Sequence, residues 1–378
     1  NGGTGQTTFA AAGLDKRPNS KPLIINGDMT IAQRATSVTG KTSSGYFTCD
    51  RWQFVANDAG TYTIAQETST SGNAYVNGFA EAYRIDCTTA DASIASDSAL
   101  FIKYKLEGRD VQVFKKGTAN AEPFTLAFWV KSNKTGTGQV NLRDENNTRQ
   151  CSATYTISSA DTWEHKICNF AADTTGALPS TNAEGFGIEW YLAAGSNFTS
   201  GTAPTAWEAI SNGDSAASLN LAISGSTSND FSLTGVQLEV GTFTSATLPP
   251  FQFESFADNL ARCYRYYIQF GKNQGAGDEG IYGLGLTNND NDGCQIQIPF
   301  PVTLRADPTA ITQSGTASDY NCRTTTTDVC TGVPQFSNAD KNSMQVNFQN
   351  SGHGFGTGVL VRGQTNSTDS FIGIGAEL

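Results

Sequence analysis

Hydrophobic and polar residues alternate in many short runs along this chain. The run 124–131 (FTLAFWVK) places Phe, Leu, Phe and Val at every second position. The same period of two recurs in the runs 102–106, 186–192, 219–223, 236–240, 296–304 and 344–348. Because successive side chains of a strand point to opposite faces, this pattern predicts half-buried β-strands. Turn signals such as Lys134-Thr135-Gly136 separate the runs, and many short strands at this spacing are typical of an antiparallel sandwich or jelly roll.

One segment has a helical pattern instead. Between residues 256 and 267, apolar side chains recur at a spacing that places them on one helical face, and Ser255 precedes the first of them as a candidate cap. Just before this segment, Pro249 and Pro250 end the strand region that precedes them and stiffen a linker. We therefore expect an all-β protein of two antiparallel β-sandwich, jelly-roll-like domains joined by a short helix, with residues 1–20 as stem and linker, 21–247 as a jelly roll and 248–378 as a C-terminal sandwich.

Composition narrows the choice of partners. Charged residues make up 16% of the 378 residues, and Gly, Ser, Thr and Asn take their place, which suits strands joined by turns. A net charge of −11 repels nucleic-acid phosphates and anionic membranes, so neither is an expected partner. No apolar run is long enough for membrane insertion. The chain opens at Asn1 rather than Met, and we expect the natural N-terminus to lie upstream.

Eight cysteines are scattered along the chain without a CxxC motif, and only two histidines accompany them. This pattern argues against a zinc site and is typical of buried thiols in a protein that folds in a reducing cytosol. Cys322 and Cys330 bracket one loop and are the best candidates for a disulfide.

Catalytic motifs are missing. His165 and His353 are the only histidines, and no serine lies in a GxSxG turn, so the sequence predicts no Ser–His–Asp hydrolase and, in our interpretation, no enzyme. A glycosidase needs only two carboxylates at a suitable separation, and 35 acidic residues are available. A glycan depolymerase of the tailspike type, a hydrolase or lyase, therefore stays open as an alternative.

Several motifs in one order carry a resemblance. They are the glycine-rich opening from Asn1 to Leu14, the stretch 26–34 with Asp50-Arg51-Trp52, the strand 124–132, the strand 236–241, the segment 258–267 (DNLARCYRYY) and the terminal Ala376-Glu377-Leu378. Together they resemble bacteriophage tail fibres, which are receptor-binding proteins with a trimeric stem, a carbohydrate-binding-module-like jelly roll and a C-terminal tip domain.

The resemblance implies a virion structural protein of the phage tail, assembled in the host cytoplasm as a homotrimer. Its partners would be a host-surface glycan or lipopolysaccharide and other tail proteins bound through the region before Asn1. The short apolar patch from Phe9 to Leu14 has no partner of its own in the sequence, which fits a stem that packs against other copies. A purely structural virion fibre or adaptor without a ligand is the second alternative.

The resemblance also implies where ligands of the jelly roll would lie. In such modules a calcium ion (Ca2+) often joins the first and last strands, and the matching positions are Asp28 and Glu239; no other cofactor is expected. Sugar platforms are aromatic, and Trp129, Glu189 and Tyr191 lie opposite the apolar rows of their strands. Packing in the core or between copies is the alternative role for Trp129.

The long polar loops of the C-terminal domain are candidate receptor contacts. The loop 350–358 (NSGHGFGTG) leaves His353 and Phe355 as its only large side chains, and the loop 314–332 holds Tyr320 and Arg323, residue types that are common at binding hot spots. The alternative is that these loops only turn between strands, or that His353 and Phe355 pack against a neighbouring copy.

Overall fold

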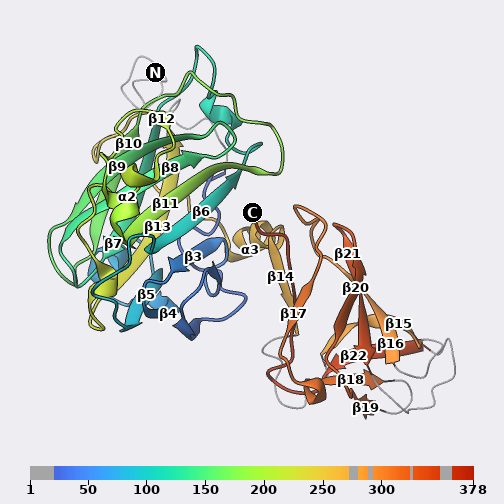
Figure 1. Ribbon diagram of the computed structural model, residues 1–378. Coiled ribbons are helices and arrows are strands. Elements are labelled where there is room, and N and C mark those ends of the chain that lie inside the picture. The colour runs from blue at the N-terminus through green and yellow to red at the C-terminus, as the bar shows by residue number, and fades with distance from the viewer. Residues whose placement is uncertain (1–20, 272–279, 288–292, 324–326, 350–359) are drawn as a thin grey trace. The chain divides into compact units, whose positions relative to one another are not determined.

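The computed structural model describes residues 21–271, 280–287, 293–323, 327–349 and 360–378 (Figure 1). The chain divides into two compact units, one up to Asn259 with Leu378, which we call unit 1, and one of residues 260–377, which we call unit 2. The division falls later in the chain than the boundary expected at 247. The reason is that residues after the two prolines still pack on unit 1, where the rings of Phe251 and Phe253 lie 4.9 Å and 5.1 Å from that of Phe79.

Unit 1 is a sandwich of two antiparallel sheets that pack face to face (Figure 1). Sheet A has the order β1 (Ser37–Lys41), β4 (Thr61–Thr68), β5 (Glu81–Thr89), β13 (Asp230–Val240), β7 (Phe124–Lys131) and β10 (Glu164–Phe170). Sheet B has the order β12 (Glu208–Ala209), β9 (Arg149–Ile157), β8 (Gly136–Asp144), β11 (Glu184–Ala194), β6 (Ala99–Glu107), β3 (Trp52–Asn57) and β2 (Gly45–Tyr46). The loops between these strands contain short helical turns, namely α1 (Gly72–Val76), η1 (Gln112–Phe114), α2 (Ser196–Thr199), η2 (Asn212–Asp214) and η3 (Ile223–Gly225).

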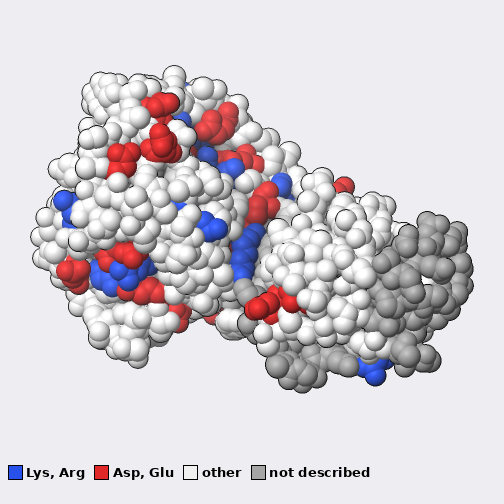
Figure 2. Space-filling view, turned by 60° about the horizontal axis from the view of Figure 1, so that its bottom comes forward, with Lys and Arg blue, Asp and Glu red and all other residues white. Residues whose placement is uncertain are grey.

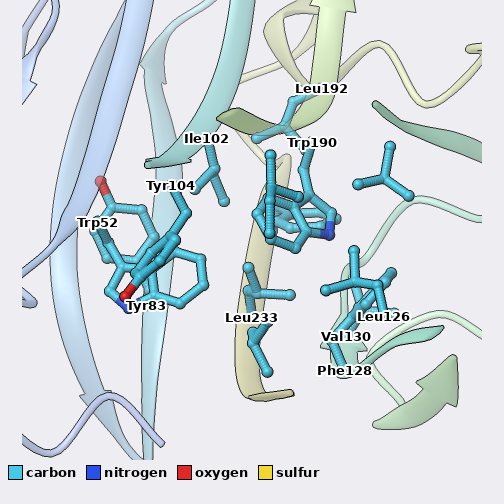
Figure 3. Close-up of a cluster of buried hydrophobic side chains, with 14 of the residues drawn as sticks. Trp52, Tyr83, Ile102, Tyr104, Leu126, Phe128, Val130, Trp190, Leu192 and Leu233 are labelled. Carbon is cyan, nitrogen blue, oxygen red and sulfur yellow. The ribbon is translucent and has the colours of Figure 1, made fainter. Parts of the chain in front are cut away.

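The core of unit 1 is built from the residues that alternate inward from both sheets. Trp190 of β11 lies at its centre, with ring centroids 5.6 Å from Trp52 and 5.8 Å from Phe128, the latter edge to face (Figure 3). Trp52 also packs on Tyr104, at 4.8 Å. Burying an aromatic side chain of this size contributes about 1.5–3 kcal/mol, so the period-two rows supply the main stabilisation of the sandwich.

Unit 2 contains a small and a large antiparallel sheet. Sheet C has the order β14 (Tyr267–Phe270), β23 (Ile372–Gly375) and β17 (Ile311–Gln313). Sheet D has the order β19 (Thr327–Val329), β18 (Tyr320–Arg323), β22 (Leu360–Thr365), β15 (Ile281–Thr287), β16 (Gly293–Pro299), β21 (Ser343–Gln349) and β20 (Gln335–Ala339), with η4 (Ala317–Asp319) before β18. Its core joins Ile296, Val346 and Phe348 of sheet D to Ile374 of sheet C.

The predicted all-β class with antiparallel sandwiches is confirmed. The predicted helix is α3 (Phe256–Tyr264), and Ser255 Oγ accepts the backbone N–H of Asp258 at 3.2 Å as an N-terminal cap. None of the helices in the described ranges is long and apolar enough to cross a membrane. The predicted stem, residues 1–20, lies outside the described residues.

Candidate functional site

A β-bulge in β13 shapes the outer face of sheet A. The register of β13 against β7 shifts between Thr234 and Gln237, and Gly235 lies in this interval with φ of 59°. A glycine adopts this left-handed conformation without steric penalty. A Cβ atom at Gly235 would lie 2.8 Å from Trp129 and 2.9 Å from Phe79. The bulge thus lets the backbone approach two aromatic rings on the outer face.

A groove of about 320 Å³ opens beside this bulge. Its lining comes from β7, β10, β13, the residues around α1 and the segment after β13: Asn77, Phe79, Trp129, His165, Gly235, Gln237, Ser245, Leu248, Pro249, Pro250, Phe251 and Phe253. We call it the Trp129 groove. All of these residues belong to unit 1.

One wall of the Trp129 groove is a stack of two rings. Trp129 and His165 are opposite residues of β7 and β10, so their side chains lie on the same face of sheet A. Their ring centroids are 4.9 Å apart and the planes differ by 26°. His165 keeps part of its side chain exposed, but its partial desolvation, and secondarily the charge of Lys166, lower its pKa below the ordinary value. The imidazole is therefore neutral at neutral pH, and the wall is a flat, uncharged aromatic surface.

Three phenylalanines lie beside this stack, and two amide side chains are also part of the lining. Phe79, Phe251 and Phe253 form one ring cluster, and Phe253 keeps about half of its side chain exposed. Gln237 donates a hydrogen bond to the carbonyl of Pro249 at 3.1 Å, which fixes the segment after β13 against the sheet. The groove thus combines apolar walls with a few polar groups, as small-molecule binding sites do.

A second hollow of about 240 Å³ lies on the same face, lined by Ser69, Ser71, Gly72, Asn73, Lys131, Asp161, Thr162 and Trp163. The start of α1 lines this hollow, and Asn77, just after the end of α1, lines the Trp129 groove. Lys131 Nζ lies 5.2 Å from the centre of the Trp163 ring and 3.1 Å from Glu67. This hollow is therefore charged, unlike the Trp129 groove.

The other two residues of the predicted sugar platform lie elsewhere. Glu189 and Tyr191 are in β11 of sheet B, so the structure does not bring them together with Trp129. Tyr191 is 2% exposed and stacks on Phe101 at 4.7 Å. Glu189 is held between Lys103 and Arg143, each at 3.1 Å. Both side chains have packing and ion-pair roles in this structure.

The outer face of sheet B is covered by the segment that includes α2 and η2. Gln139 donates to the carbonyl of Asp214 and Asn141 to that of Ser215, both at 2.7 Å. Tyr191 packs under the same segment, against Phe198 and Ala216. An exposed sugar platform around Tyr191 is therefore closed by the chain itself.

The candidate calcium ligands lie in different surroundings. Asp28 accepts hydrogen bonds from Thr30 Oγ1 at 3.0 Å and Asn259 at 3.2 Å, and burial raises the pKa of its carboxyl group. Glu239 is buried in β13, opposite Thr125 of β7. Among the described residues, no group of three or more His, Cys, Asp or Glu side chains is arranged to hold a metal ion. The calcium site stays a prediction.

The candidates of the C-terminal domain are separated as well. Tyr320 is fully buried in the core of unit 2, where its hydroxyl donates to the carbonyl of Phe371 at 2.6 Å. Arg323 lies in β18 directly opposite Arg362 of β22. His353 and Phe355 lie outside the described residues. Tyr320 therefore offers no contact surface here, and Arg323 is the one described member of this set near the surface.

All eight cysteines are buried free thiols. The sulfur nearest to Cys322 belongs to Cys294, at 3.0 Å, whereas Cys330, the partner expected from the sequence, is 3.9 Å away. Three thiols thus converge inside unit 2.

Comparisons with known proteins give structural likenesses only. No protein-family model and no curated protein matches the chain. Among solved structures, the enzymatically active domain of bacteriophage CBA120 tailspike protein 4 aligns with 58% of this chain and 21% of its own, at 9% identity and a TM-score of 0.28. A mutant of the family 29 carbohydrate-binding module CBM29-2, complexed with mannohexaose, aligns with 57% of this chain and 99% of its own, at 10% identity and a TM-score of 0.27.

The module TmCBM61, solved with β-1,4-galactotriose, aligns with 58% of this chain and 98% of its own, at 6% identity and a TM-score of 0.28. At these scores the likenesses carry no functional argument, so the function is argued below from the residues of the chain.

Proposed function

We propose that this chain is a surface-binding protein that holds a glycan in the Trp129 groove of unit 1. The observation that carries the proposal is the flat Trp129–His165 stack, which lies beside a cluster of phenylalanine rings in an open groove. Sugar rings present C–H faces that pack on aromatic rings, and their hydroxyl groups need the kind of amide that Asn77 and Gln237 supply. The neutral lining favours an uncharged stretch of polysaccharide.

The biological setting of the proposal comes from the sequence resemblance. The ordered motifs support the distal part of a phage tail fibre, a virion protein that attaches to a host-surface glycan or lipopolysaccharide. In this proposal the fibre is a homotrimer, and the region before Asn1 joins it to other tail proteins. Strands and turns rich in uncharged polar residues suit such an exposed, rigid adhesin.

The proposal is binding without cleavage. A glycosidase flanks the scissile bond with two carboxyl groups, about 5–9.5 Å apart depending on mechanism. None of the described residues that line the Trp129 groove carries a carboxyl group. In this proposal a glycan bound in the groove dissociates without being cleaved, which suits an adhesin.

The test is the affinity of the full chain for an array of neutral and acidic bacterial polysaccharides. Trp129→Ala is expected to weaken binding of the preferred polysaccharide at least tenfold, or about 1.4 kcal/mol, and Trp129→Phe to weaken it less. Tyr75→Ala is the matched control, because Tyr75 is an exposed aromatic residue of α1 that does not line the groove.

Unchanged binding by a folded Trp129→Ala variant would contradict the site. Release of oligosaccharide from the bound polysaccharide would replace the proposal with the depolymerase alternative. Binding that depends on Arg323 but not on Trp129 would move the receptor site to the C-terminal domain.

A further inference from the structure

The lining of the Trp129 groove is more apolar than the hydroxyl groups of a sugar require. Seven of its twelve residues are Phe, Trp, Leu or Pro. The Trp129–His165 stack alone offers a flat surface for the C–H face of a sugar ring. The phenylalanines add apolar surface beside it, because Trp129 and Phe251 both pack against the cluster around Phe79. A ligand that fills the groove therefore has an apolar substituent next to its sugar ring.

Phe253 is the most exposed of the three phenylalanines, at 52%, whereas Phe251 is half-buried and Phe79 is buried. Its ring is fixed in place, since its centroid lies 4.8 Å from that of Phe251 and 5.1 Å from that of Phe79. Gly78 lies against it, because a Cβ atom there would be 2.9 Å from the ring. A ring that is already held in place loses little freedom when a ligand packs on it. Phe253 is therefore suited to bind a small apolar group.

Two amides are among the polar groups of the groove. Gln237 Nε2 donates to the carbonyl of Pro249 at 3.1 Å, and Asn77 Nδ2 donates to that of Asn73 at 2.7 Å. These carbonyl partners determine which end of each amide is nitrogen. The amide oxygens are then the natural acceptors for a donor on the ligand.

The lining of the groove carries no charge. None of its described residues is Asp, Glu, Lys or Arg, and His165 is neutral at neutral pH. In the view of Figure 2, charged side chains gather in patches with uncharged surface between them, so the net charge of −11 is not spread evenly. An ammonium or carboxylate group bound in the groove would lose water without gaining an ionic partner. The donor on the ligand is therefore an uncharged group.

We propose that the glycan bound in the Trp129 groove carries an N-acetylated amino sugar whose acetamido group packs on Phe253. The inference rests on the proposed function and specifies the class of sugar that the groove selects. An acetamido group joins an uncharged N–H donor to a methyl group, which matches amide acceptors beside an exposed apolar ring. A hydroxyl group in its place brings no apolar surface, and a free amino group brings a positive charge.

The test uses bacterial polysaccharides with and without N-acetylated amino sugars, bound to the full chain. A polysaccharide that binds is N-deacetylated, and its amino groups are then either acetylated again or formylated. The formamido group keeps the uncharged N–H and loses only the methyl group. We expect the acetylated sample to bind about fourfold more tightly than the formylated one, which is the effect of burying one methyl group.

Phe253→Ala should reduce this difference to less than about twofold, because the methyl group then stays exposed to water. Its binding of the formylated sample should change little. Phe256→Ala is the matched control, since Phe256 is a phenylalanine of α3 with 62% exposure that does not line the groove. This variant should keep the full difference between the two samples.

Polysaccharide binding that depends on Trp129 but needs no acetamido sugar would overturn this inference and leave the proposed function standing. Equal binding of the acetylated and formylated samples would do the same, and so would a methyl preference that persists in Phe253→Ala. The absence of any binding that depends on Trp129 would overturn the proposed function itself, and this inference with it.

Discussion

His165 is a residue whose neutrality follows from its surroundings. Its ring is stacked on Trp129, and partial desolvation is the main cause that lowers its pKa, with the charge of Lys166 second. Protonation would place a charge against the indole inside the Trp129 groove. The sequence singled out Trp129 from its strand face, but it could not pair it with His165, because the register of β7 against β10 is a tertiary property.

The lowered pKa predicts how stability depends on pH. The unfolded chain binds a proton at His165 near pH 6.5, whereas the folded chain binds it only at lower pH. This contribution to the free energy of unfolding is therefore complete above pH 6.5 and is lost as the pH falls through the folded-state pKa.

Urea denaturation at pH 7 and pH 5 should show a smaller loss of stability for His165→Gln than for the natural chain. Parallel pH profiles for the two proteins would contradict the prediction.

Burial also disfavours the charged form of Asp28, and for a carboxyl group this raises the pKa. The ionised form is disfavoured in the folded state, while Thr30 and Asn259 donate to an oxygen that an amide also offers. Asp28→Asn should therefore stabilise unit 1 by up to about 1 kcal/mol at pH 7. The gain should disappear as the pH falls below the ordinary carboxyl value.

Urea denaturation in EDTA and in calcium checks both roles of Asp28. If calcium stabilises the natural chain but not Asp28→Asn, the carboxylate holds the ion that the resemblance implies. A variant that is destabilised in EDTA would show that the carboxylate charge itself is favourable here.

At the scale of elements, the bulge of β13 and the segment after it make the Trp129 groove. The alternating run 236–240 predicted the second half of this strand. The bulge itself produces no repeating pattern of apolar residues, and Gly235 is its one signal in the sequence. Phe251 and Phe253 follow the two prolines and have no strand pattern that would place them against Phe79. The groove was therefore predictable from the sequence only through Trp129.

Gly235→Ala tests the importance of the bulge. The left-handed φ of 59° is strained for alanine, and its Cβ atom would press on Trp129 and Phe79. We expect a loss of about 1–3 kcal/mol in urea denaturation, with weaker glycan binding. Gly225→Ala is the control, since a Cβ atom there meets nothing within 4 Å. Equal stability of the two variants would show that the bulge tolerates a side chain.

At the scale of the whole molecule, alternation along the sequence predicts the strands and their inward rows, because burial of one face dictates a period of two. It does not predict which outer face is covered. The segment that closes sheet B binds through backbone carbonyls of Asp214 and Ser215, and carbonyl groups leave no trace in the sequence. The alternation therefore predicted a surface position for Tyr191, although its side chain is packed under that segment.

The cysteines were expected to be buried thiols, and the structure places all eight inside the two units. Burial raises the pKa of Cys151 to about 11 and that of Cys168 to about 12. At pH 8 a thiol of pKa 11 is thiolate in roughly one molecule in a thousand. Iodoacetamide should thus label these thiols of the native chain slowly and label them fast after unfolding.

Cys322 differs from the other cysteines, because two sulfurs lie close to it. Cys294 is at 3.0 Å and Cys330 at 3.9 Å. Oxidised glutathione can accept the electrons of such a pair, so that two protein thiols and one small disulfide give one protein disulfide and two glutathione thiols. Because Cys322 is common to both close pairs and Cys294 is nearer, we expect the product to be Cys294–Cys322.

Non-reducing peptide mass spectrometry of the oxidised chain should find this disulfide in the natural protein and in Cys330→Ser, and not in Cys322→Ser. A disulfide between Cys322 and Cys330 would instead support the pairing predicted from the sequence, where these two cysteines bracket one loop. A disulfide elsewhere in the chain would contradict the convergence of these three thiols.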